Sequence, residues 1–345
     1  MRRFVSVVLF SLIAVISFWG ILKYAKTQED IKRQSLVNIE TVKVYTDLQS
    51  NILEEIGDAF YAETGLQLEV IHVNKNQIIH HDINDSVQAD IFLTSQNTLS
   101  QLKKTGRLKN YSSAFTDTAL DLFKDADGAW TGIWVDPVVF VVNKDFMEKH
   151  PLFNYNWTEV MVSSQVRLTF TDFIAAEMAE DVLMSLVEHF GLSESFYLLN
   201  QAKPHIVQYG KYLSTPARMT GMGKCDVGIS SYNEAIRAQK DNLPIRVLYP
   251  TDGAPWYLYG VGLSVNSKNP ERGKKLIDWL LTPAKYKRIM QNNNYYTVYV
   301  NDFRVDPDIN GSELMYWGLE KNYIEEGKKV LLDQWMDKIR FGRNS

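Results

Sequence analysis

The residues best suited to chemistry in this sequence are hydroxyl and carboxylate side chains that follow short β-branched runs. A strand is expected around 42–44, and the polar turn after it contains Thr46, Asp47 and Ser50. Apolar residues then recur at helical spacing. A strand that feeds a helix in this way directs free N–H groups and hydroxyls toward one point, which suits an anion or another polar ligand. The turn is equally explained if Asp47 or Ser50 only caps the helix.

The same pattern recurs at three later points in the chain. Each time, a short apolar run predicts a buried strand and ends in hydroxyl or acidic residues. The runs end near 93, 170 and 229, and the polar residues that follow them are Thr94, Ser95, Thr171, Asp172, Ser230, Ser231 and Tyr232. Strands that alternate with helices predict a parallel sheet whose ligand lies beyond the carboxyl ends of the strands.

Length and composition predict a two-domain chain with well-formed cores. The chain has 345 residues, of which 45% are hydrophobic and 12% aromatic. The net charge is −4, and no basic stripe marks a nucleic-acid interface, so we expect no nucleic-acid partner.

Patterns typical of enzymes and metal centres are missing from the sequence. Cys225 is the single cysteine, which rules out an intramolecular disulfide and a cysteine-cluster metal site. His80 and His81 form an adjacent pair in a polar segment and are expected to be solvated. There is no Ser-His-Asp arrangement, no His-x-x-x-His helix and no phosphate-cradling glycine loop. We therefore expect a protein that is not an enzyme and uses no cofactor and no metal.

The N-terminus predicts an export segment. Arg2 and Arg3 precede the uncharged apolar run 4–22, and Lys23 and Lys26 follow it. At about 1.5 Å per residue this run can cross a bilayer of about 30 Å. No cysteine follows it, which excludes a lipoprotein anchor, and no clean Ala-x-Ala site is visible. We expect a signal peptide or uncleaved membrane anchor at 1–26, a spacer at 27–40, and a folded part in the periplasm or on the outer face of the cytoplasmic membrane.

Two apolar strands divide the folded part into two lobes. The run 138–142 follows the Asp136-Pro137 turn and is expected to cross into a second lobe, and 261–265 is expected to return. The predicted division assigns 41–139 and 260–345 to lobe 1 and 140–259 to lobe 2. We expect the sheet of lobe 2 to be separate from that of lobe 1.

Four longer segments resemble, in their order along the chain, signatures of the extracellular solute-binding proteins of ABC importers. They read ADIFLTSQNTLSQLKKTGRLKNY, GAWTGIWVDPVVFVVNK, KCDVGISSYNEA and VGLSVNSKNPERGKKLIDWLLTPAKYKRIM. The similarity covers about residues 41–300 and is greatest to the group that binds ferric ions, phosphonates and sugar phosphates. It implies the type II periplasmic-binding-protein fold, in which two doubly wound α/β lobes are joined by two crossover strands and hold the ligand between them.

The resemblance also implies a set of ligand-binding residues. They lie in the turns after the strands and in the segment that crosses between the lobes. The residues are Thr46, Asp47, Ser50, Thr94, Ser95, Asp136, Thr169, Thr171, Asp172, Ser230, Ser231 and Tyr232.

Ferric iron is the first ligand to consider, because iron-binding relatives use paired tyrosinates with histidine or carboxylate ligands. This chain has Ser95 where that pattern has a carboxylate, and Tyr232 follows a serine instead of a second tyrosine. The pair Tyr295-Tyr296 lies outside the family's metal position and is expected to serve packing. Hydroxyl donors predict instead a small anionic solute, an organophosphate or a phosphonate.

The role of the protein has two interpretations. As a monomer it would deliver its solute to an ABC permease, or it would report the solute to a membrane histidine kinase. Ferric-ion binding remains the third alternative.

Overall fold

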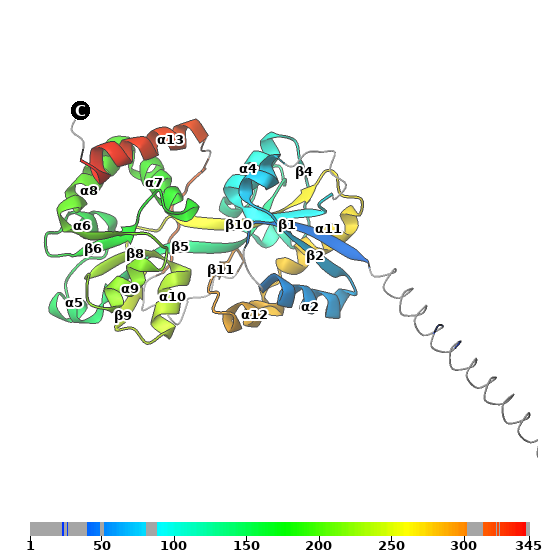
Figure 1. The fold of residues 1–345 in the computed structure, drawn as a ribbon, viewed down its shortest axis with the longest axis horizontal. Helices are drawn as coiled ribbons and strands as arrows, with labels where there is room; N and C mark the ends of the chain where they lie inside the picture. The colour runs from blue at the N-terminus through cyan, green and yellow to red at the C-terminus, as the bar shows by residue number, and fades with distance from the viewer. Residues whose placement is uncertain are drawn as a thin grey trace, which may run out of the picture.

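The computed structural model describes residues 23, 26, 40–48, 52–80, 88–301, 313–321, 323 and 325–342. They form two α/β lobes side by side (Figure 1). Ser50 and most of the predicted export segment and spacer lie outside the described residues. Within the part of the chain that the structure describes, no helix has the length and apolar character needed to cross a bilayer.

Lobe 1 is built on a mixed sheet with the strand order β2-β1-β3-β10-β5. The first three strands are parallel, and β10 runs antiparallel to β3 and β5. The strands are β1 (Thr41–Thr46), β2 (Gln67–His72), β3 (Ile91–Ser95), β10 (Trp256–Ser264) and β5 (Thr131–Asn143), with β4 (Leu108–Lys109) and β11 (Val298–Tyr299) at the edges. The helices are α2 (Ile52–Thr64), α3 (Lys75–His80), α4 (Gln96–Lys104), α11 (Pro270–Leu280) and α12 (Lys287–Asn292).

Lobe 2 repeats the same architecture with its own strands. The parallel strands β7, β6 and β8 lie in that order, and β5 pairs antiparallel with β8 and β9. The strands are β6 (Leu168–Thr171), β7 (Ile206–Gly210), β8 (Val227–Ser231) and β9 (Ile245–Leu248). The helices are α5 (Lys144–Lys149), α6 (Trp157–Val162), α7 (Glu177–Phe190), α8 (Leu192–Ala202), α9 (Thr215–Gly221) and α10 (Tyr232–Lys240).

Strand β5 joins the lobes and is buried along its whole length. Its residues 131–137 pair with β10, and its residues 138–143 pair with β8 and β9. Among the described strands, β5 alone pairs in both lobes, so the hydrogen-bonded path is continuous from β2 to β7. The α/β fold class is confirmed, but the expectation of two separate sheets is wrong, because the crossing strand is long enough to serve both.

The C-terminal helix packs on lobe 2, whereas the sequence predicted residues 260–345 to belong to lobe 1. Helix α13 (Glu325–Gln334) continues into the π-helical turn Trp335–Arg340, and this segment covers α7 and α8 (Figure 1). Trp335 is fully buried against Phe170 and Phe173. This buried tryptophan holds the end of the chain on the lobe that the strand pattern did not predict.

Candidate functional site

The turn after β1 brings Asp47 next to Thr94. Strand β1 pairs with β3 so that Thr46 lies opposite Leu93. Asp47 follows Thr46, and Thr94 follows Leu93. Thr46 is fully buried, and its Oγ1 accepts a hydrogen bond from the Leu48 amide at 3.1 Å. Thr46 therefore shapes the turn, while Asp47 follows the end of β1 and Thr94 is the penultimate residue of β3.

Asp47 and Thr94 both carry a buried oxygen without a hydrogen-bond partner. These atoms are Asp47 Oδ1 and Thr94 Oγ1, and Thr94 is fully buried. Burial raises the pKa of Asp47, and Glu177 raises this pKa further. The nearby Thr94 hydroxyl lowers the pKa in part, although the two side chains do not have hydrogen-bond geometry. Buried polar atoms are normally paired, so two neighbouring exceptions mark a place where a ligand would supply the missing partners.

Ser95 links the two lobes. It is the N-cap of α4, where its Oγ accepts from the Thr98 amide at 3.4 Å. The same Oγ donates to Glu177 Oε1 of α7 at 3.2 Å. Lys75 of α3 also reaches Glu177 Oε1, at 3.2 Å, so one carboxylate of lobe 2 contacts two helices of lobe 1.

Asp136 is buried at the crossing between the lobes. Its Oδ1 accepts a hydrogen bond from the Asn233 amide at 3.1 Å. Burial raises the pKa of Asp136 to about 8; the Asn233 amide and the Ser231 hydroxyl lower it, and Glu234 raises it. The carboxyl group is therefore mostly protonated at neutral pH, and it can donate a hydrogen bond as well as accept one.

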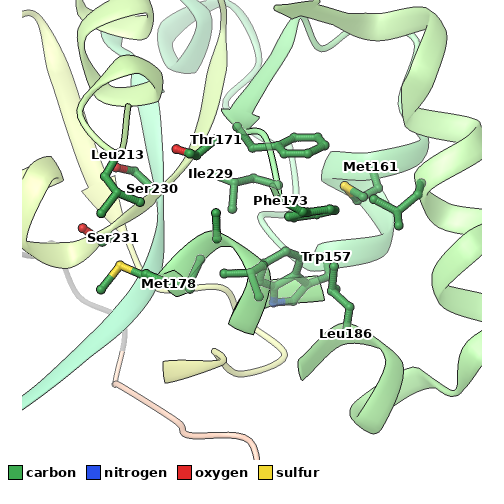
Figure 2. A pocket seen from close by; sticks show the side chains of 15 residues that line it. Trp157, Met161, Thr171, Phe173, Met178, Leu186, Leu213, Ile229, Ser230 and Ser231 are labelled. Atoms are coloured by element: carbon green, nitrogen blue, oxygen red, sulfur yellow. The ribbon is translucent and has the colours of Figure 1, made fainter. Parts of the chain in front are cut away.

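Three of the predicted hydroxyls line a pocket in lobe 2, at the carboxyl ends of β6 and β8. Figure 2 shows Thr171, Ser230 and Ser231 at one end and the apolar groups of Trp157 and Met161 at the other. The Ser230 hydroxyl is buried without a partner, whereas Ser231 caps α10 and Thr171 donates to the Tyr212 carbonyl at 3.3 Å. The pocket has a volume of about 30 Å³. It holds no more than a few water molecules in this arrangement, since each water needs about 10–15 Å³.

Three predicted site residues make contacts within the protein in this arrangement. Thr169 is fully buried and donates to the Gln208 carbonyl at 2.8 Å. Asp172 accepts from Trp335 Nε1 at 3.2 Å and from Arg340 Nε at 2.7 Å, which fixes the C-terminal helix to lobe 2. Tyr232 is buried in a cluster with apolar residues of β5, α10 and β9. These contacts give all three a packing function in this arrangement.

Two tyrosines and one glutamate near the predicted site were not foreseen. Tyr257 and Tyr259 lie two residues apart on β10, with ring centroids 5.2 Å apart. Burial raises the pKa of Tyr259, and the carboxylates of Asp47, Glu177 and Asp136 each raise it further. The repeat Tyr-Leu-Tyr in the return strand was a usable signal for the tyrosines. Glu177 has the appearance of any acidic residue in a first helical turn, so nothing in the sequence distinguished it.

Tyr295 and Tyr296 make different contacts. Tyr295 packs on Trp134, with ring centroids 6.2 Å apart. Burial raises its pKa, and Tyr259 and Asp136 raise it further. The Tyr296 amide donates to Asn233 Oδ1 at 2.9 Å. Among the described residues there is no group of three or more histidine, cysteine, aspartate or glutamate side chains arranged to hold a metal ion.

Comparison with known proteins gives relatives of one kind. The spermidine/putrescine-binding periplasmic protein of Escherichia coli is 26% identical over 99 residues, which are 29% of this chain and 28% of that protein. The periplasmic binding protein AfuA of Actinobacillus pleuropneumoniae, solved with fructose-6-phosphate, has a TM-score of 0.66 at 19% identity and covers 87% of this chain and 99% of that one. A Bordetella ferric binding protein has a TM-score of 0.73 at 18% identity, with 88% and 100% covered.

The structural similarities support the two-lobed periplasmic-binding-protein fold, which the sequence resemblance implied. The family model described as bacterial extracellular solute-binding protein matches residues 42–292, which include both lobes and both crossings. The chain therefore belongs to the bacterial extracellular solute-binding protein family.

Proposed function

We propose that this protein captures a small solute between its two lobes, outside the cytoplasmic membrane, and delivers it to an ABC permease. One observation carries this proposal. Thr94 of lobe 1 and Ser230 of lobe 2 are at least 95% buried at the carboxyl ends of β3 and β8, and neither hydroxyl has a partner. An unsatisfied buried hydroxyl costs about 1–3 kcal/mol. A solute that accepts hydrogen bonds from both would recover this free energy and hold the lobes together.

We further propose that the group accepting these bonds is the phosphate or phosphonate of an organic solute. Hydroxyls donate to it from Thr94, Ser230 and Ser231, and the helices α4 and α10 begin beside them, where backbone amides favour an anion. Asp136 does not oppose this, because its pKa of about 8 leaves it mostly neutral at pH 7. The sugar phosphate in the AfuA structure is consistent with a ligand of this class.

Ferric iron is a second candidate, favoured by Tyr257, Tyr259 and Tyr295 near Asp136. Tyrosine binds iron as tyrosinate. Burial raises the pKa of each of these phenols, which opposes their deprotonation until a metal enters. Ferric citrate would give a visible tyrosinate-to-iron absorption band if iron were the solute, and we expect no band.

We also propose that the protein binds its solute without catalysing a reaction, that it is a monomer, and that residues 1–26 are an export segment. A membrane-anchored binding protein would also suit a sensor histidine kinase as partner. Genes for a permease and an ATPase beside this one would favour import, and genes for a kinase and a response regulator would favour sensing.

A thermal-shift screen against phosphorylated and phosphonylated metabolites tests the proposed ligand class. A ligand at 100 times its Kd adds about 2.7 kcal/mol to the free energy of unfolding. We expect stabilisation by members of this set and none by ferric citrate. Stabilisation by ferric citrate alone, or by polyamines such as those that name the E. coli relative, would contradict the phosphate assignment.

A further inference from the structure

We infer that the solute also carries an ammonium group, and that Asp47 selects for it from the end of β1. This inference rests on the proposed function, because it concerns the other end of the same solute. It assigns the ligand to one chemical class, an organic phosphate or phosphonate with a free amine.

One carboxylate oxygen of Asp47 lacks a hydrogen-bond partner. Its Oδ1 is buried and has no donor, although it lies where β1 and β3 end side by side. The adjacent Thr94 is fully buried, and its Oγ1 has no partner either. A buried carboxylate oxygen needs a donor, and an ammonium group brings three donors together with the opposite charge.

The charges around Tyr259 also favour a cation. Asp47 and Glu177 both act on this phenol, whereas Asp136 adds little charge at pH 7 because its pKa is about 8. Of the cations named in this environment, Lys75 contacts Glu177 at 3.2 Å, and it is the weakest of the influences on the pKa of Asp47. Lys75 is thus engaged by Glu177, and it compensates the charge of Asp47 only in part.

Two tyrosine rings lie on the strand β10 that pairs with β3 and β5. Tyr257 and Tyr259 lie with their ring centroids 5.2 Å apart at the same crossing. Tyrosine rings attract ammonium groups through their π faces, and the attraction grows when water is excluded. The hydroxyls of Ser230 and Ser231 in lobe 2 offer no such attraction and instead suit an acceptor. The hydroxyls therefore favour the phosphate group, and Asp47 with the tyrosine rings favours the ammonium group.

The test uses two matched probes, phosphorylethanolamine and ethyl phosphate, which differ in the amine. Isothermal titration calorimetry at pH 7 with the wild-type protein should show that the amine-bearing probe binds at least about tenfold more tightly. Asp47→Asn should reduce this ratio to near one. Asp47→Glu should restore part of the preference. Asp58→Asn, an exposed change on α2, is the control and should keep the wild-type ratio.

The outcomes separate this inference from the proposed function. Equal affinity for both probes in the wild type would overturn the ammonium site and leave the phosphate site standing. Tight binding of putrescine, lost in Asp47→Asn, with no binding of either phosphate would support the ammonium site and overturn the phosphate assignment. No binding of any probe at millimolar concentration would overturn both. Thermal unfolding of each variant confirms that it is folded.

Discussion

Lys75 Nζ lies 3.2 Å from Glu177 Oε1, and this ion pair joins helix α3 of lobe 1 to helix α7 of lobe 2. Ser95 donates to the same carboxylate oxygen at 3.2 Å, and Asn97 Nδ2 reaches Asp181 Oδ1 at 3.4 Å one turn further along α7. Donors of lobe 1 thus face carboxylates of lobe 2 where the two lobes are in contact. These contacts hold the lobes together. Glu177 accepts a hydrogen bond from the Ser95 hydroxyl, which the sequence analysis assigned to the ligand.

Glu177→Gln should shift the protein toward a more open arrangement. The ion pair is partly exposed, so its loss should change the balance between open and closed forms by no more than about 1 kcal/mol, or roughly fivefold. Small-angle X-ray scattering should show a larger radius of gyration for the ligand-free variant than for the ligand-free wild type. Addition of solute should reduce the radius of gyration of the variant. Glu194→Gln, at an exposed position of α8, is the control. An unchanged radius in Glu177→Gln would show that these contacts do not set the opening.

The stability of the protein should depend on pH through Asp136. The pKa of Asp136 is about 8 in the folded protein, whereas its ordinary value is 3.8. At a pH between these two values the folded protein keeps a proton on Asp136 that the unfolded chain has released. The contribution of Asp136 is therefore fully present below about pH 4 and is lost as the pH rises to about 8, with a slope of at most about 1.4 kcal/mol per pH unit.

Urea unfolding of the wild type and of Asp136→Asn at several pH values from 5 to 8 measures this contribution. Asparagine keeps an oxygen for the Asn233 amide but has no proton to release. The free energy of unfolding of the wild type should fall, relative to that of the variant, as the pH rises. Parallel curves would mean that Asp136 is already ionised in the folded protein. Affinity for an anionic solute should decline only as the pH approaches and passes about 8, because the carboxylate of the folded protein ionises there and would repel the anion.

Trp335→Ala should destabilise lobe 2 by about 3–5 kcal/mol, because it removes a fully buried indole from the contact with Phe170 and Phe173. It also removes the donor that reaches Asp172 Oδ1 at 3.2 Å. Chemical denaturation checks the loss, with the half-exposed Val330→Ala of α13 as control. A change under about 1 kcal/mol would mean that the C-terminal helix is not part of the cooperative fold.

The strand-to-helix pattern was predictable because it is local. The β-branched run before Thr46, the apolar run that ends at Thr94 and the long run through Pro137 each specify a buried strand by their own composition. The order of these units, together with the resemblance, was enough to predict the α/β fold class and the family. The same patterns indicated the strand ends where Thr94, Ser230 and Ser231 stand.

Contacts between distant residues were not predictable in this way. Trp335 meets Asp172 across 163 residues, and the tail has no strand pattern to show which lobe it covers. Glu177 faces Ser95 across 82 residues, and an acidic residue in a first helical turn has the same local sequence whether it faces solvent or another lobe. Thr169 and Asp172 satisfy the pattern of a site residue but have found partners within the protein. Only the three-dimensional arrangement separates the hydroxyls that are paired from those that are free.

Hydroxyls from both lobes are proposed to bind the solute. Substitution of Thr94 and Ser230 tests this most directly, because neither hydroxyl makes a hydrogen bond within the protein. Calorimetry with the tightest phosphorylated ligand of the screen should show Thr94→Val and Ser230→Ala each weakening binding by about 1–3 kcal/mol, roughly tenfold to a hundredfold in Kd. Ser95→Ala and Ser231→Ala should weaken it as well, with an added loss of helix capping. Tyr296→Phe, whose backbone amide makes the contact to Asn233, should have little effect. Wild-type affinity in both Thr94→Val and Ser230→Ala, with a large loss in Tyr295→Phe, would contradict the account and favour iron.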